Sequence, residues 1–108
     1  MIDATPSYFV EGESTSRQYE LREGADLATL TGATGVSLDV LDGDGVSVTV
    51  TGTTTLNVTT RLVTYTPGTE IDASLTQPLS ATFWVTFTGG STRAFPEPTG
   101  MPWYVRRS

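Results

Sequence analysis

Two aspartates separated by a glycine form the one stretch of this chain that is spaced like a metal-binding loop. Asp42-Gly43-Asp44-Gly45 matches the first half of a calcium loop, which also needs a bidentate glutamate at its twelfth position. Counted from Asp42, that position is Thr53, so the essential glutamate is missing. The same residues are typical of a β-turn, because glycine accepts a positive φ and aspartate hydrogen-bonds to the local backbone. We therefore expect a turn here, no metal site and no cofactor.

The residue types that most side-chain catalysis requires are missing from the 108 residues. The chain has no histidine, cysteine or lysine, and all six of its cations are arginines. A serine nucleophile would therefore have no base to activate it, and thiolate and Schiff-base chemistry are excluded. A carboxylate pair for glycoside hydrolysis is conceivable in any acidic β-protein, but nothing singles out a pair. We expect no catalytic residues and no enzymatic activity.

The charge of the chain restricts its partners. The formal net charge is −6 and the isoelectric point is about 4.3, which argues against nucleic acid and anionic membranes as partners, since both need a basic surface. No apolar run approaches the ~20 residues that span a membrane, and no signal peptide is visible at the N-terminus. The acids gather in residues 1–54 and most arginines in residues 55–108, a distribution that suits head-to-tail stacking or merely reflects solvated loops.

The pattern along the chain predicts an all-β fold. Threonine and valine are abundant, both are β-branched, and no stretch has a sustained helical apolar period. Turn signals every eight to twelve residues indicate a β-sandwich or small barrel of about seven or eight strands over residues 18–108, preceded by an N-terminal arm, residues 1–17. The expected strands are 18–23, 28–32, 36–42, 46–52, 55–60, 61–67, an ambiguous 70–75, a hairpin around Gly89-Gly90, and a last strand from Met101. The expected core residues are Val36, Leu38, Val40, Val48, Val50, Val63, Tyr65, Phe83, Val85, Phe87 and Val105.

The hairpin places an aromatic side chain where a polar one is usual. Trp84 alternates with Phe83 and Val85 and should therefore lie on the opposite sheet face. A two-residue loop would set Trp84 opposite Phe95, whereas a three-residue loop would move Phe95 to the core face and set Trp84 opposite Pro96. Clustered exposed aromatics mark interfaces, but the N-terminal arm could also fold back over Trp84. The candidate partner-contact residues are Tyr8, Phe9, Trp84 and Phe95.

The order of the motifs resembles a known group of phage proteins. Asp26-Leu27 leads into LTGATGVSLDVLDGDG, a strand ends in VTYTP, and SATFWVTFTGG is followed by RAFPEPTGMPWYVR. This arrangement is similar to the small immunoglobulin-like domains of tailed-bacteriophage virions, in particular the N-terminal domain of baseplate upper proteins. The resemblance covers residues 26–106, and residues 1–25 have no counterpart in the group. It implies an immunoglobulin-like β-sandwich over residues 18–108 and an attachment role, and it brings no catalytic residues.

Two functions remain open at this point. The first is a non-enzymatic, multi-copy structural protein of a tailed-phage virion, assembled in the bacterial host cytoplasm, where a chain without cysteines fits. It would dock onto other virion proteins of the capsid, neck, tail or baseplate, for example as a capsid decoration. The alternative is a carbohydrate-binding or adhesion module, because tryptophan and tyrosine faces also stack on sugars. A calcium-dependent adhesin repeat is disfavoured, since the loop at Asp42 is incomplete and the chain has no internal repeat.

Overall fold

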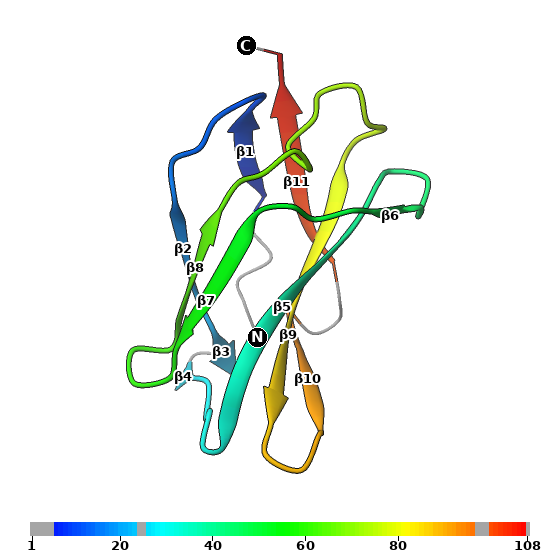
Figure 1. Cartoon of the computed structure of the whole chain (residues 1–108). Helices are drawn as coiled ribbons and strands as arrows, with labels where there is room; N and C mark the ends of the chain where they lie inside the picture. The colour runs from blue at the N-terminus through cyan, green and yellow to red at the C-terminus, as the bar shows by residue number, and fades with distance from the viewer. Residues whose placement is uncertain (1–5, 24–25, 97–99, 108) are drawn as a thin grey trace.

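The computed structural model describes residues 6–23, 26–96 and 100–107, and this part of the chain is all-β (Figure 1). Within these residues no helix is present, and hence none that is long and apolar enough to cross a membrane. The strands are β1 (Ser7–Val10), β2 (Arg17–Glu20), β3 (Arg22–Glu23), β4 (Asp26–Leu27), β5 (Ala33–Leu41), β6 (Ser47–Val48), β7 (Thr53–Asn57), β8 (Leu62–Thr66), β9 (Leu79–Phe87), β10 (Thr92–Phe95) and β11 (Met101–Arg106).

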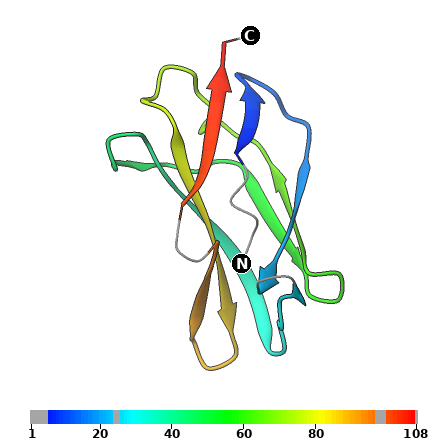
Figure 2. The same cartoon turned by 180° about the vertical axis from the view of Figure 1, so that it is seen from behind.

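Two sheets form the layers of a β-sandwich. The larger has the order β1-β11-β9-β5-β6, with β10 also paired to β9, and the smaller has the order β2-β8-β7. The short strands β3 and β4 form a separate pair. The first strand, β1, runs parallel to the last strand, β11, whereas the other pairings of the described strands are antiparallel. The view from behind shows β1 and β11 side by side (Figure 2).

Strand β9 is the centre of the larger sheet. Along one edge it pairs with β5 from Ser80 to Phe87. Along the other edge it pairs first with β11 and then with β10, so β10 and β11 follow one another on the same side. The prolines at this end of the chain agree with that break, because proline cannot donate to a strand ladder. Pro96 directly follows β10, and Pro102 lies within β11.

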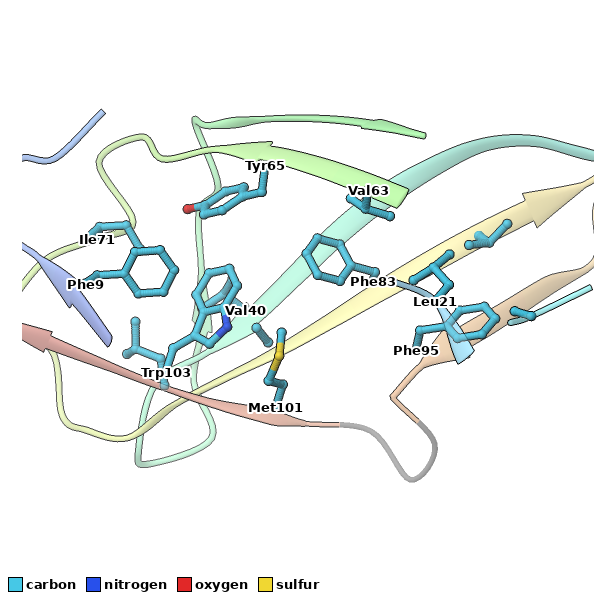
Figure 3. Packing of buried hydrophobic residues seen from close by; sticks show 14 of the residues in the cluster. Phe9, Leu21, Val40, Val63, Tyr65, Ile71, Phe83, Phe95, Met101 and Trp103 are labelled. Carbon is cyan, nitrogen blue, oxygen red and sulfur yellow. The ribbon is translucent and has the colours of Figure 1, made fainter. Parts of the chain in front are cut away.

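The core between the sheets is rich in aromatic side chains (Figure 3). Trp103 from β11 contacts Phe9 from β1 and Tyr65 from β8, with ring centroids 4.8 and 5.0 Å apart. Tyr19 from β2 lies 5.3 Å from Phe83 of β9 and joins the same cluster. Six of the eleven expected core residues are fully buried: Val40, Val63, Tyr65, Phe83, Val85 and Val105. The other five are partly buried and pack against that core: Val36, Leu38, Val48, Val50 and Phe87.

Several predicted strands are wrong. Residues 28–32 do not form a strand, although Ala28 and Leu30 are buried. The Ala28 amide donates to the Leu21 carbonyl at 2.9 Å, but this single bond does not extend into a strand ladder. Residues 70–75 are turns and coil, and the predicted strand 18–23 is divided at Leu21 between β2 and β3. The buried residues of these segments, Leu21, Ala28, Leu30 and Ile71, were also missing from the expected core, and a local pattern does not show whether the backbone extends into a strand ladder.

The segment expected to be an arm is part of the sheet. Residues 7–10 form β1, and Arg17 begins β2, while residues 1–5 lie outside the described residues. The burial of Phe9 stabilises β1 in the sheet. Its side chain is 2% exposed, and the Arg17 guanidinium lies 3.9 Å from the centroid of its ring. Burial of a phenylalanine contributes about 1.5–3 kcal/mol, which a free arm would forgo.

The outer edge of β1 is closed by the connection to β2. The Val10 amide donates to Oε1 of Glu13 at 2.6 Å, and the Glu13 amide donates back to the Val10 carbonyl at 3.0 Å. Arg17 donates to the Tyr8 carbonyl at 2.5 Å and forms an ion pair with Glu13 at 3.1 Å. These bonds occupy backbone groups that an edge strand otherwise offers to another chain.

The separation of charge along the sequence is not preserved in space. Arg106 and Arg107 lie at the end of β11, where the β1–β2 and β8–β9 connections also lie (Figure 1). Those connections carry the carboxylates of Glu11, Glu13 and Asp72. Arginines and acids are therefore mixed at this end of the sandwich, and the fold does not form the simple dipole that head-to-tail stacking would use.

Two phenylalanines on β9 provide a test of the core. We expect Phe83→Ala to lower the free energy of unfolding by about 3–5 kcal/mol, because Phe83 is fully buried. Phe87→Ala should cost about 1–2 kcal/mol, since Phe87 is partly buried near the end of the strand. Urea unfolding of both variants measures the difference. Equal losses of unfolding free energy would contradict the deeper burial of Phe83 than of Phe87.

Candidate partner-binding surface

The structure separates the four residues expected to contact a partner. Tyr8 is on the surface, with 67% of its area exposed, and Trp84 is half-buried on the outer face of the larger sheet. Phe9 and Phe95 are in the core, with 2% and 0% exposed. The four therefore do not form one surface patch. The prediction that Phe9 and Phe95 lie at a partner contact is wrong, because both side chains are in the core.

The register of the β9–β10 hairpin explains the position of Phe95. Ala94 lies opposite Trp84, and Phe95 lies opposite Phe83, which differs from both registers expected from the sequence. The Phe87 amide donates to the Ser91 carbonyl, so the loop is Thr88 to Gly90. The three-residue alternative predicted the correct face for Phe95 but a wrong partner for Trp84. Gly89 and Gly90 both have positive φ, which lets the chain turn one residue earlier than expected.

The N-terminal segment does not place Tyr8 or Phe9 over Trp84. Tyr8 on β1 pairs with Tyr104 on β11, and β11 lies between β1 and the strand of Trp84, β9. Phe9 points into the core. Trp84 lies between Ser37 on β5 and Ala94 on β10 in the outer face. The hypothesis that Tyr8 and Phe9 cover Trp84 is therefore wrong.

A different pair of aromatic residues forms an exposed surface on the outer face. Tyr8 and Tyr104 stack with their ring centroids 5.5 Å apart and their planes at 16°. Tyr104 is 37% exposed, and Arg106 follows on the same side of β11. The hollow at this pair has a volume of about 400 Å³ and is lined by Tyr8, Phe9, Tyr104, Val105 and Arg106. We call Tyr8, Tyr104 and Arg106 the tyrosine surface.

Hydrogen bonds to the backbone of β11 hold the strand that carries Tyr104. Val105 is buried, and the Gln77 side chain binds both of its backbone groups, donating to the carbonyl at 2.6 Å and accepting from the amide at 2.7 Å. These bonds continue the sheet where pairing of β11 with β9 ends at Trp103. Together with the closed edge of β1, they hold both strands, so the tyrosines are positioned by packed backbone rather than by a loop.

Tyr104 was not among the residues selected from the sequence. Alternation in the segment from Met101 to Arg106 separates Trp103 and Val105 from Tyr104, so its outward direction could have been inferred. Its pairing with Tyr8 could not, because the parallel contact of β1 with β11 joins the two ends of the chain and has no local signal.

A buried carboxylate organises the loops at the same end of the sandwich. Glu70 is 1% exposed, and its Oε1 accepts hydrogen bonds from the amides of Thr51 at 2.9 Å and Gly52 at 3.1 Å. Its Oε2 accepts from the Gly68 amide at 3.0 Å and from the Tyr65 hydroxyl. A Cβ on Gly52 or Gly68 would collide with backbone atoms of the other segment, so glycine is required where these loops meet.

Hydrogen bonding determines the charge of Glu70. Burial alone would raise the pKa of Glu70, but the bonds from Tyr65 and from the backbone amides outweigh it and hold the pKa below its ordinary value. Burial, followed by the neighbouring carboxylate, raises the pKa of Tyr65, so its hydroxyl stays protonated and donates. Both oxygens of Glu70 are occupied by these donors, and the arrangement is suited to holding loops together.

Several other carboxylates accept hydrogen bonds that hold the backbone in place. Asp42 closes the predicted turn, since its Oδ1 accepts from the amides of Asp44 at 2.8 Å and Val46 at 3.0 Å. Glu11 accepts from the Ala73 amide at 2.8 Å beside a second hollow of about 440 Å³, which Asp72 also lines. Across residues 6–23, 26–96 and 100–107, no group of three metal-ligating side chains could hold an ion.

The fold and this surface define a non-helical sandwich domain with an exposed aromatic face. No family model, curated protein or solved structure matches the chain.

Substitution of the buried carboxylate has a predictable effect. We expect Glu70→Gln to lower the free energy of unfolding at pH 7 by about 2–4 kcal/mol, because the amide cannot satisfy four donors. Since the folded pKa of Glu70 is lowered, its contribution is present above about pH 4.3, the unfolded value, and is lost as the pH falls through the folded value.

Denaturant unfolding between pH 7 and pH 3 measures this effect. The variant should lose less stability than the parent chain below about pH 4.3. Asp39→Asn is the control, because Asp39 is exposed and should change stability by less than about 0.5 kcal/mol. If Glu70→Gln matched that control at pH 7, the buried network would contribute nothing to folding.

Proposed function

We propose that this chain is a non-enzymatic docking module of a tailed-phage virion, present in several copies and attached to capsid, neck, tail or baseplate proteins. It would be assembled in the bacterial host cytoplasm and bind through a sandwich face. The observation that carries the proposal is the strand order, taken together with the motifs that resemble phage immunoglobulin-like domains.

The strand order supports an immunoglobulin-like assignment. In such domains the second, fifth and fourth strands form one sheet, and the third, sixth and seventh form the other. The sheet β2-β8-β7 corresponds to the former, and β6-β5-β9-β11 corresponds to the latter with the additional edge strand of variable-type domains. One difference is that β1 pairs with the last strand, whereas the first strand of the constant type joins the sheet of the second.

The tyrosine surface supports a role in protein docking. Tyrosine and arginine are enriched among residues that dominate binding energy at protein interfaces. Tyr8 is 67% exposed on a strand that is otherwise well anchored, so the isolated chain leaves an aromatic ring in water on rigid backbone. A partner that covers both tyrosines would bury apolar surface without first ordering a loop.

A carbohydrate-binding or adhesion module is the second candidate, because the exposed tyrosine rings could stack on a sugar. The lining of the hollow favours a protein instead. The side chains of Phe9 and Val105 point into the core, so the tyrosine hydroxyls and Arg106 are the side-chain groups that could bind sugar hydroxyls, and the lining includes no carboxylate or amide side chain beside them. A glycan array probed with the labelled chain distinguishes the candidates, since virion docking predicts no binding.

The decisive measurement is the composition of the particle. We expect quantitative mass spectrometry of density-purified phage particles, produced from the genome that encodes the chain, to detect several copies per particle. The double variant Tyr8→Ala and Tyr104→Ala should reduce this occupancy at unchanged expression, because it removes the exposed rings. Val46→Ala with Val58→Ala is the matched control, as both valines are exposed elsewhere and occupancy should be retained. A chain that stays in the lysate and is absent from particles would refute the proposal.

A further inference from the structure

We propose that the tyrosine surface binds an extended acidic segment of a partner polypeptide, with an apolar side chain in the hollow and a carboxylate paired with Arg106. The inference rests on the proposed function in one respect, namely that the ligand is a protein.

The charge of Arg106 is the first argument. Arg106 is exposed and lines the hollow. Within the described part of the chain, the ion pairs are made by Arg17 and Arg22, and no carboxylate lies within ion-pair distance of Arg106. The adjacent Arg107 is different, because its charge faces Asp72, whose pKa is lowered first by hydrogen bonds from Ser74 and to a smaller extent by the charge of Arg107. Arg106 is therefore a cation available to a partner carboxylate, and such complementarity selects partners.

The shape of the hollow is the second argument. Its volume of about 400 Å³ lies at the small end of the range for binding pockets, so it admits a side chain and the backbone around it rather than a whole domain. Tyr8 and Tyr104 form its aromatic side, and the backbone of two well-anchored strands lies beneath them. An apolar side chain placed there gains burial against both rings, while an adjacent carboxylate reaches Arg106.

A second copy of this chain fits the surface less well. A two-fold contact presents the same residues from both sides, and Tyr8, Tyr104 and Arg106 supply no carboxylate that could pair with Arg106. The occupant is therefore expected to come from a different polypeptide.

The experiment uses the purified chain and a displayed library of random seven-residue peptides. We expect the selected peptides to carry an aspartate or glutamate beside an aromatic or aliphatic residue. Their affinity, measured by fluorescence anisotropy in 0.15 M salt, should fall about tenfold for Arg106→Glu. Tyr8→Ala should weaken the same peptides.

The matched control is Arg107→Glu, which changes the net charge equally but lies outside the hollow, so it should have little effect. A selection without an acidic consensus, or equal losses for Arg106→Glu and Arg107→Glu, would overturn the inference. A glycan that binds the parent chain and not Tyr8→Ala would overturn it in favour of a saccharide. The particle measurement is independent, so a chain that is present in virions but ignores acidic peptides refutes this inference alone.

Discussion

The packing of Trp103 against Phe9 and Tyr65 is the interaction on which the rest of the structure depends. It joins the first strand, the last strand and the opposite sheet through ring contacts of about 5 Å. Once Phe9 is buried, the alternation of β1 forces Tyr8 to the outer face, and burial of Trp103 does the same for Tyr104. The exposed tyrosine pair is thus a direct consequence of how the core is filled. The indole Nε1 of Trp103 has no hydrogen-bond partner among the described residues, a cost of about 1–3 kcal/mol that the aromatic packing must offset.

Tyr65 connects this core to the polar network at the end of the sandwich. Its ring packs on Trp103, while its hydroxyl donates to Glu70, whose carboxylate binds the loops at Thr51, Gly52 and Gly68. A buried charge is tolerated here because four donors replace its water. The network fixes the connection between β8 and β9, and the next residues of that connection lead to Gln77, which holds β11 beneath Tyr104. The surface and the buried carboxylate are therefore parts of one supported region.

The sequence predicted which side chains face the core better than it predicted which strands pair. Two-residue alternation identified the inward residues of β5, β8 and β9, because a sheet buried on one face shows that period directly. It failed where backbone pairing had to be known. Ala28 and Leu30 alternate like a strand but lie outside every strand ladder, and β1 was taken for an arm because its partner lies at the other end of the chain. In the candidate site, the outward direction of Trp84 was predicted, and Tyr8, selected as a candidate contact, is exposed. Phe95 lies on the core face, as the three-residue alternative alone predicted, but the register differs from both alternatives because the loop begins one residue early.

The hydrogen bonds on the free edge of β1 restrict how a partner could bind there. An edge strand offers both its backbone and its side chains, and proteins usually protect the backbone to prevent strand addition. In β1 the groups on the free edge are occupied by Glu13 and Arg17, so another chain cannot extend the sheet there without breaking these bonds. The face of the same strand is left exposed at Tyr8. A partner that bound at this edge would therefore have to contact side chains on the sheet face, a mode that makes binding depend on the identity of the partner's residues rather than on its backbone.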